Sequence, residues 1–258
     1  DSSGKHDLDT LAEKHLDIQT IKYEELVGKG KKQLLLSDLP AEDVFRYACE
    51  DADITLKLYD YFRDKLNKLK DQMILYNDVE LPLIKILSRM ELAGVKVDKS
   101  KLSKLSDTFG KKISELENNV YKIVGHSFNI SSPKQLQEVF YEEMDLPVLK
   151  KTPKGQPSTS EDVMIDLAEH HEVPKLVLEY RNLSKLKNTY TDKLGETVNQ
   201  HTKRLHTSYN QTVTITGRLS SSNPNLQNIP VKTKDGRDIR KTFIPEKGST
   251  IISADYSQ

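Results

Sequence analysis

The spacing of the apolar residues changes near residue 200, and this change limits the folds that the chain can adopt. Over most of the first 200 residues they recur every three or four positions, the period of one face of an α-helix. From Leu205 to Val213 every second residue instead belongs to the same face, as in a strand. Residues 239–244 and 250–254 resemble further strands. The sequence therefore predicts an α+β, predominantly helical protein whose sheet begins near the end.

Two long helices are predicted in the first half. One covers residues 40 to about 69, and the other begins at Asp98 or Ser100, either of which can cap it, and ends at Gly125. The predicted apolar faces are Val44, Ala48, Thr55, Leu58, Phe62, Leu66 and Leu69 in the first helix, and Leu102, Leu105, Phe109, Ile113, Leu116, Val120 and Ile123 in the second.

Three further helices are predicted in the second half. Ser132 followed by proline opens a short helix, Ser158 with Glu161 forms a capping-box pattern, and Pro174 begins a long helix. Residues 150–157 are rich in proline, glycine and lysine, which predicts a mobile loop.

The composition excludes several classes of protein. With 36% hydrophobic residues among 258, the chain can build a core, so disorder throughout is excluded. No apolar run approaches the ~20 residues of a membrane span. The single cysteine, Cys49, excludes an internal disulfide and a zinc site built mainly of cysteines, and it indicates a reducing, intracellular compartment. The chain begins with Asp1 and lacks a signal peptide, so we expect an excerpt of a longer protein.

The charges are unevenly distributed although the formal net charge is zero. Residues 1–98 contain 15 basic and 20 acidic side chains, whereas residues 201–258 contain 9 and 4. The basic last quarter is compatible with a nucleic-acid surface. On charge alone, a solvated face is the favoured alternative.

The first stretch that can carry chemistry is Tyr47–Asp51. On a helix, Asp51 falls on the apolar face, Glu50 and Asp53 point away, and Tyr47 lies one turn earlier. A carboxylate on a buried face needs a partner. Asp51 is therefore either a metal ligand beside a phenol, or a carboxylate bonded to a buried backbone group or an arginine.

The second stretch is the polar run of residues 216–230. Arg218, Asn225, Gln227 and Asn228 supply hydrogen-bond donors, and the small residues around them allow close backbone approach. The minor groove presents acceptors at similar positions on A·T and T·A pairs, so such donors can test base-pair shape without reading sequence. The alternative is a polar connecting loop.

The third stretch ends in Asp255, which follows the apolar residues 250–254. A carboxylate at the end of a strand can hold a divalent ion, and Mg²⁺ favours one or two carboxylates together with substrate phosphates. The alternative is an ordinary strand-ending Asp. Separately, Arg181 and Lys185 lie one helical turn apart, where they either contact phosphate or are solvated.

At these places the sequence resembles the family A DNA polymerases of the bacterial DNA polymerase I type. The run Thr-Gly-Arg-Leu-Ser-Ser … Pro-Asn-Leu-Gln-Asn-Ile-Pro, followed by Ser-Ala-Asp-Tyr-Ser-Gln, is highly specific. Tyr47-xxx-Asp51 resembles the third motif of the family's 3'-5' exonuclease. The resemblance covers essentially the whole chain.

The resemblance implies four segments. Residues 1–67 correspond to the C-terminal part of an RNase H-like 3'-5' exonuclease domain, and residues 68–98 to a connecting helical region. Residues 99–200 correspond to a helical thumb that grips duplex DNA. Residues 201–258 correspond to the start of the polymerase palm and end at its first catalytic carboxylate motif.

The resemblance also implies roles for individual residues. Asp255 matches the carboxylate that bridges two Mg²⁺ ions, Tyr256 offers a main-chain carbonyl to one of them, and Asp51 and Tyr47 belong to the exonuclease site. Arg218 matches a contact to the primer terminus. The other implied DNA contacts are Asn225, Gln227, Asn228, Asn129, Ser131, Ser132, Arg181 and Lys185.

The implied function is DNA-directed DNA polymerisation by two-metal nucleotidyl transfer, in replication and repair, with 3'-5' proofreading. The implied partners are primer–template DNA and deoxynucleoside triphosphates, for a monomer in the bacterial cytoplasm at the nucleoid. Because the chain supplies one ligand to each site, we expect it to be inactive alone. Two alternatives stay open: a non-catalytic duplex-binding module and a relative of single-subunit RNA polymerases, against which the exonuclease-like segment argues.

Overall fold

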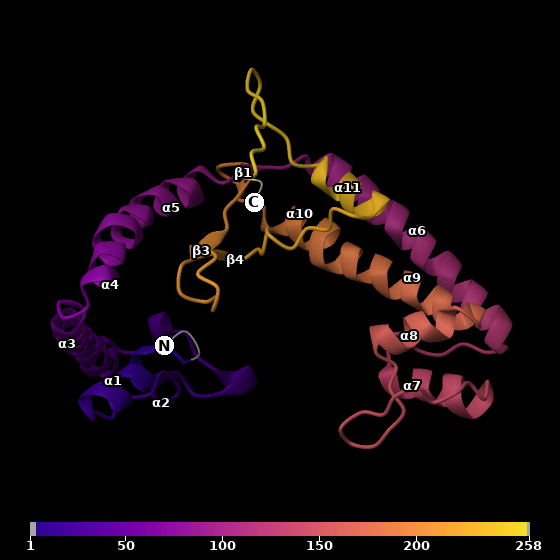
Figure 1. Ribbon diagram of the computed structural model, residues 1–258, viewed down its shortest axis with the longest axis horizontal. Helices are drawn as coiled ribbons and strands as arrows, with labels where there is room; N and C mark the ends of the chain where they lie inside the picture. Colours follow the sequence, from indigo (N-terminus) through magenta and orange to yellow (C-terminus); the bar gives the residue numbers. More distant parts are fainter. Residues whose placement is uncertain (1–3, 257–258) are drawn as a thin grey trace. The chain divides into compact units, whose positions relative to one another are not determined.

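A computed structural model describes residues 4–256 of the chain. The chain divides into two compact units (Figure 1). Unit 1 comprises the residues up to 90 together with 209–220, and unit 2 comprises 91–208 and the residues from 221 onward. The two last residues of the final motif, Ser257 and Gln258, lie outside the described residues.

Unit 1 is helical in its N-terminal part. Its main core joins α1 to α3, with Ala12, Ile54 and Leu58 buried between the two helices. The helices from the N-terminus onward are α1 (Leu8–Leu16), α2 (Tyr23–Val27), η1 (Gly30–Lys32), η2 (Leu36–Asp38), α3 (Ala41–Leu66), α4 (Lys70–Leu75), the π-helical turn η3 (Tyr76–Glu80) and α5 (Leu81–Ala93), which runs into unit 2.

The buried face of α3 differs from the predicted one. Ile54 and Leu58 are buried, whereas Ala48 and Thr55, which were expected on this face, are exposed. Ile54 lies one helical turn before Leu58, and α1 packs against these two residues. The buried face of α3 is therefore rotated by about one residue from the predicted face. The helix also ends at Leu66, short of residue 69.

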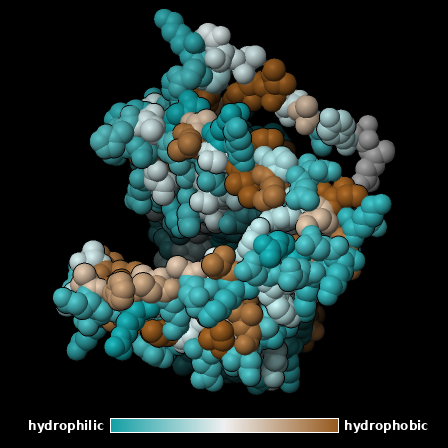
Figure 2. Space-filling model, turned by 90° about the vertical axis from the view of Figure 1, so that its left-hand side faces the viewer, coloured by the Kyte–Doolittle hydropathy of each residue, from teal (hydrophilic) through white to brown (hydrophobic). Residues whose placement is uncertain are grey.

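Several large apolar side chains of unit 1 are exposed. Figure 2 views the side of the chain on which α3, α4 and α5 lie, and apolar side chains appear there among polar ones. Those on α4 and α5 that are about half exposed or more include Ile74, Leu75, Ile84 and Ile86.

Unit 2 is organised around the long helix α6 (Lys99–Val124). Asp98 caps its start by accepting from the backbone N–H groups of Ser100 and Lys101, and Gly125 ends it at a φ of 91°, as predicted. The shorter elements that follow are α7 (Pro133–Gln137), capped by Ser132 as predicted, the π-helical η4 (Glu138–Glu143) and α8 (Glu161–Ala168).

A second long helical segment lies beside α6. It consists of α9 (Glu172–Leu186), the π-helical turn η5 (Lys187–Asp192) and α10 (Lys193–Thr197), which follow one another without a break. Buried side chains from both segments, including Phe109, Leu116, Tyr180 and Leu183, form one apolar core. This core is the main stabilising feature of unit 2.

Three sequence expectations about unit 2 need correction. The helix predicted from Pro174 begins two residues earlier at Glu172, which leaves the proline in the first turn, where its missing N–H costs nothing. The N-cap of α8 is Ser160 rather than Ser158, whose hydroxyl instead bonds that of Ser160. Residues 150–157, expected to be a mobile loop, form a hydrogen-bonded turn closed by a bridge between Lys151 and Pro157.

The sheet is much smaller than predicted. Strand β1 (Val95–Lys96) pairs antiparallel with β2 (Arg204–Leu205), and a bridge from Val97 to Phe243 extends this pairing. Gly94 precedes β1 at a φ of 61°, and a Cβ there would lie 2.5 Å from the carbonyl oxygen of Leu205. Only glycine fits this position.

The remaining strand predictions fail in part. The predicted strand from Leu205 to Val213 is reduced to β2 and to β3 (Ser208–Asn210), and β4 (Ser220–Ser222) follows. The predicted strand over 239–244 begins inside a helix, α11 (Lys234–Arg240), because Thr233 caps its start by accepting from the N–H of Gly236. Residues 250–254 form no strand.

The shared core gives a direct stability prediction. Phe109 is 1% exposed on α6, so Phe109→Ala should lower the free energy of unfolding by about 3–5 kcal/mol, through lost burial and an unfilled cavity. Urea denaturation followed by circular dichroism measures this. Ile123→Ala on the same helix is the matched control, because Ile123 is 45% exposed. Equal effects of the two substitutions would contradict the assignment of the core.

Candidate nucleic-acid interface and catalytic residues

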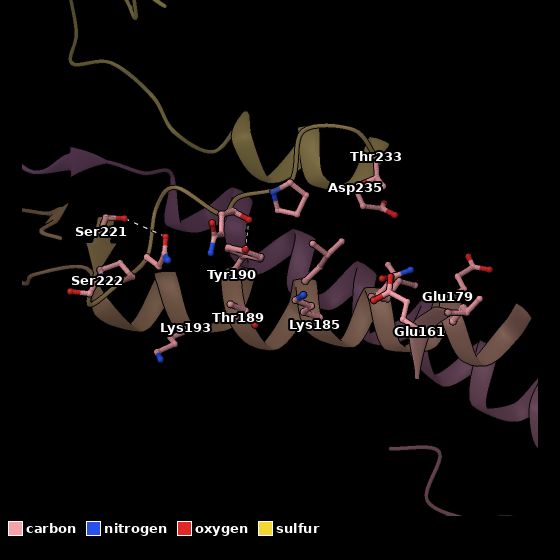
Figure 3. Close-up of a pocket in the computed structure, with 18 of the residues that line it drawn as sticks. Glu161, Glu179, Lys185, Thr189, Tyr190, Lys193, Ser221, Ser222, Thr233 and Asp235 are labelled. Atoms are coloured by element: carbon pink, nitrogen blue, oxygen red, sulfur yellow. Dashed lines mark hydrogen bonds between the residues drawn. The ribbon is translucent and has the colours of Figure 1, made fainter. Parts of the chain in front are cut away.

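A groove of about 1280 Å³ runs along one face of unit 2 (Figure 3). One wall is the helical segment α9–η5–α10, and the other is the loop from Ser221 that leads into α11. Of the residues predicted to contact DNA, Lys185, Asn225 and Asn228 line this groove. The structure thus brings together residues that lie about 40 positions apart in the sequence.

The loop wall is held by its own side chains and by the core. The phenol of Tyr190, which is buried in the apolar core, donates a hydrogen bond to the carbonyl oxygen of Asn228. Ser221 accepts from the backbone N–H of Leu226 at 2.9 Å and donates to Oδ1 of Asn225 at 3.3 Å. These bonds fix the loop on the helical wall.

The amides of the loop are oriented by the same network. Oδ1 of Asn225 accepts from the Ser221 hydroxyl and from the backbone N–H of Gln227 at 3.0 Å, so both of its acceptor positions are used. Oε1 of Gln227 accepts from the Ser221 N–H at 3.1 Å. Both amide residues are exposed.

Both signs of charge occur along the groove. Lys185 lies midway along the groove in Figure 3 and Lys193 lies toward the end that carries Ser221 and Ser222. The carboxylates of Glu161 and Glu179 lie at the opposite end. Lys175 and Asp235 also line the groove, so three lysines and three carboxylates contribute to its lining.

Sequence reasoning missed part of the helical wall. Asn182, Thr189 and Lys193 line the groove together with Lys185. Their spacing of three or four residues is a polar stripe at helical period, which could have been recognised opposite the apolar stripe of the same helix.

Arg181 is placed differently from Lys185. It lines a neighbouring hollow of about 520 Å³ together with Ser131, and its Nη1 donates to the carbonyl oxygen of Thr159 at 2.7 Å. Burial lowers the pKa of its guanidinium, which nevertheless stays charged. The structure therefore places the two predicted phosphate contacts on different hollows of the helix.

Asn129, Ser131 and Ser132 lie in the loop between α6 and α7. The side-chain Oδ1 of Asn129 accepts from the backbone N–H of Ser131 at 2.9 Å. The backbone N–H of Asn129 donates to Oε1 of Gln135 at 2.6 Å. Ser132 caps α7. The Ser131 hydroxyl lies 3.3 Å from the phenol oxygen of Tyr180 on α9. Each of the three side chains is therefore held by a hydrogen bond, and Asn129 and Ser131 are exposed.

Arg218 belongs to the 209–220 segment of unit 1. Its side chain is exposed, and its carbonyl oxygen accepts a hydrogen bond from the hydroxyl of Thr214. This bond closes the turn that contains Gly217, at a φ of 73°.

Asp51 and Tyr47 lie together on α3 of unit 1, and both are half-buried. Burial, followed by a hydrogen bond to the Asp51 carboxylate, raises the pKa of the Tyr47 phenol. The phenol therefore stays protonated at neutral pH and is available as a donor beside the carboxylate. Glu50, expected to point away, is half-buried instead and accepts from the N–H of Ile21 at 2.6 Å.

Asp255 and Tyr256 are exposed in unit 2 and lie in a segment without regular structure. The expectation that Asp255 ends a strand is therefore wrong for this chain. Asp51 lies in the other unit. Within residues 4–256, no three His, Cys, Asp or Glu side chains are grouped to hold a metal ion.

The comparisons with known proteins identify the family of the chain. Residues 99–258 match the family model described as DNA polymerase family A, and residues 1–67 match the one described as 3'-5' exonuclease. The chain belongs to DNA polymerase family A. It is 47% identical to DNA polymerase I of Pseudomonas aeruginosa over 258 residues, which is 100% of this chain and 28% of that protein. It is 41% identical to DNA polymerase I of Bacillus subtilis over 237 residues, 91% of this chain and 26% of that one.

A solved structure supports the same family. The POL domain of Pol1 from M. smegmatis, in complex with DNA primer-template and dNTP, matches with a TM-score of 0.79 and 33% identity, over 95% of this chain and 39% of that one. The chain spans about a quarter of the length of the curated relatives quoted above. In the described part of the chain, no helix combines the length and apolar character that crossing a membrane requires.

A histidine beside the α6–α7 loop gives a pH prediction. Nε2 of His126 lies 2.7 Å from the Glu143 carboxylate and Nδ1 lies 3.3 Å from the Ser127 carbonyl, so a protonated ring can donate to both. The bond to Glu143, followed by that to Ser127, raises the pKa of His126 above 6.5. Its contribution to stability is full below pH 6.5 and is lost as the pH rises through the raised pKa.

Glu143→Gln should lower the pKa of His126, as measured by NMR titration of the ring protons. Glu142→Gln is the control, because Glu142 is exposed and does not contribute to the raised pKa of His126, so this substitution should leave the titration unchanged. A titration unaffected by Glu143→Gln would show that this contact is absent in solution.

Proposed function

We propose that the full-length protein is a DNA-directed DNA polymerase with a 3'-5' exonuclease, and that the groove of unit 2 binds primer–template duplex. The observation that carries the proposal is the pairing of a lysine-bearing helical wall with an amide-rich loop across one groove. The relatives' names, and the primer-template and dNTP in the matching solved structure, support it. A monomer in the bacterial cytoplasm is part of the same proposal.

The two walls suit different parts of a duplex. Lys185 and Lys193 neutralise backbone phosphates, which provides affinity without sequence preference. The NH₂ donors of Asn225 and its neighbours suit minor-groove acceptors, which lie at similar positions on A·T and T·A pairs. Arg218 supplies a rigid set of donors for the primer terminus in the same scheme.

Asp255 and Tyr256 would hold Mg²⁺ at the polymerase site. A carboxylate and a main-chain carbonyl are the hard oxygen ligands that Mg²⁺ prefers, and among the described residues no ion pair uses the Asp255 carboxylate. When bound, the metal ions supply charge stabilisation for the attacking and leaving oxygens of an in-line displacement. The contribution of Asp255 would be its carboxylate, which is exposed and so accessible as a ligand.

Asp51 and Tyr47 would serve the exonuclease in unit 1. The Asp51 carboxylate offers oxygen ligands, and the protonated Tyr47 phenol beside it can orient a water or a phosphate oxygen by donating a hydrogen bond. A non-catalytic duplex-binding module remains the second candidate, because the groove alone accounts for DNA binding. The match to DNA polymerase family A favours a DNA polymerase over a relative of single-subunit RNA polymerases.

Duplex binding should depend on the groove lysine. In the full-length protein, Lys185→Ala should weaken binding equally for all sequences and reduce the slope of log K against log salt by ~0.9, the loss of one phosphate contact. Fluorescence anisotropy at several salt concentrations measures this. Lys122→Ala, at an exposed position of α6 outside the groove, is the control. An unchanged slope for Lys185→Ala would exclude this lysine from the interface.

The two activities should be separable by single substitutions. Asp255→Asn in the full-length protein should lower single-nucleotide incorporation by at least ~100-fold and leave degradation of a mismatched primer intact, because the two carboxylates lie in different units. Asp51→Ala should do the reverse. Single-turnover assays of both reactions with both variants test this. Incorporation by Asp255→Asn within about tenfold of wild type would refute the polymerase assignment.

A further inference from the structure

A buried serine is bonded to three consecutive residues of the groove loop. Ser221 lies on β4 at the edge of the groove, yet it is only 3% exposed (Figure 3). Its hydroxyl donates to Oδ1 of Asn225 at 3.3 Å and accepts from the backbone N–H of Leu226 at 2.9 Å. Its own N–H donates to Oε1 of Gln227 at 3.1 Å. One residue that a ligand cannot reach thus orients two side chains that a ligand can reach.

These bonds determine which atoms of Asn225 remain for a partner. A side-chain amide offers an acceptor oxygen and an NH₂ group with two donors. The oxygen of Asn225 already accepts from the Ser221 hydroxyl and from the N–H of Gln227 at 3.0 Å, so both of its lone pairs are used. In the described part of the chain, Nδ2 of Asn225 makes no hydrogen bond. An exposed Asn225 is therefore a donor toward a ligand.

The backbone of the loop is attached by other residues. The hydroxyl of the buried Thr207 lies 3.0 Å from the carbonyl oxygen of Ser222 and 2.8 Å from that of Pro224, and it donates to this pair of acceptors. At the other end of the loop, the phenol of Tyr190 donates to the carbonyl oxygen of Asn228. Loss of the Ser221 hydroxyl should therefore release the Asn225 amide without detaching the loop.

The orientation of the amide matters for the ligand that the groove is proposed to bind. The minor groove presents acceptors, N3 of adenine and O2 of thymine, at similar positions. A hydrogen bond weakens steeply when its angle falls below about 120°, so a donor has to be held in one direction. An amide that turns over about its last bond exchanges its NH₂ group for its oxygen, and an oxygen cannot pair with these acceptors.

We propose that Ser221 is a positioning residue for duplex recognition: its hydroxyl occupies the oxygen of Asn225, so that the amide directs a donor at an acceptor on a base edge in the minor groove. This inference rests on the proposed function, because it requires the groove to bind primer–template duplex. Ser221 itself does not touch the DNA.

The test removes single acceptor atoms from the DNA. In 3-deazaadenine a C–H group replaces N3, so a duplex with one such base lacks one minor-groove acceptor. The full-length wild-type protein should bind roughly 3- to 10-fold more weakly when this base lies at the contacted position, the cost of about one hydrogen bond. Fluorescence anisotropy measures this, with the base moved one pair at a time along either strand. Asn225→Ala should remove the penalty and so identify the position.

Ser221→Ala should reduce the same penalty to less than about twofold. It should bind unmodified duplex as weakly as the wild type binds the substituted duplex. The slope of log K against log salt should not change, because the lysines of the helical wall are untouched. Ser208→Ala is the matched control: Ser208 is exposed on β3, which pairs with β4, and in the described structure its hydroxyl makes no hydrogen bond. It should keep the full penalty.

The outcomes separate the inference from the proposed function. A penalty that Asn225→Ala abolishes but Ser221→Ala retains would overturn the inference alone. A changed salt slope in Ser221→Ala would also overturn it, because the loop or the helical wall would then have moved as a whole. If no position shows a penalty in the wild type, or if the penalty survives in Asn225→Ala, the proposed minor-groove role of Asn225 is itself refuted.

Discussion

The packing of α6 against the α9–η5–α10 segment is the interaction on which the rest of unit 2 depends. Two amphipathic helical segments bury their apolar faces against each other, and the polar faces that remain become available for binding. Tyr190 contributes both to the core and to the groove, because its ring is buried in the core and its hydroxyl donates a hydrogen bond to the carbonyl oxygen of Asn228 in the groove loop. The binding surface is therefore attached directly to the part of the unit with the most buried apolar contact.

The sequence predicted the long helices of unit 2 well, because their signals are local. Asp98 and Gly125 cap α6 where expected, and Ser132 caps α7, since capping requires only neighbouring residues. Strands were predicted poorly because a strand needs a partner, and alternation alone does not provide one. Residues 250–254 have the right composition for a strand, yet no described segment pairs with them.

The sequence predicted a set of DNA-contacting residues, but not which of them lie together. Motif resemblance identified Lys185, Asn225 and Asn228, and the structure shows that they share a groove. The separation of Arg181 from Lys185 was not predictable, because it depends on the carbonyl of Thr159, more than twenty residues away. The ion pairs of Glu246 with Lys96 and Arg204 were not predictable for the same reason, since Lys96 and Glu246 are separated by 150 residues.

The π-helical turn η5 has a geometric consequence for the groove. In an uninterrupted α-helix, a residue eight positions after Lys185 would lie about 80° further around the axis, near the edge of the groove wall. The wider turn at Lys187–Asp192 advances each residue by a smaller angle, so it changes the angle around the axis between Lys185 and Lys193. The length of this turn, and not only the identity of its residues, therefore determines which cations face the groove. Deletion of Asn188, which does not line the groove, would rotate the wall while leaving every side chain that lines it chemically intact.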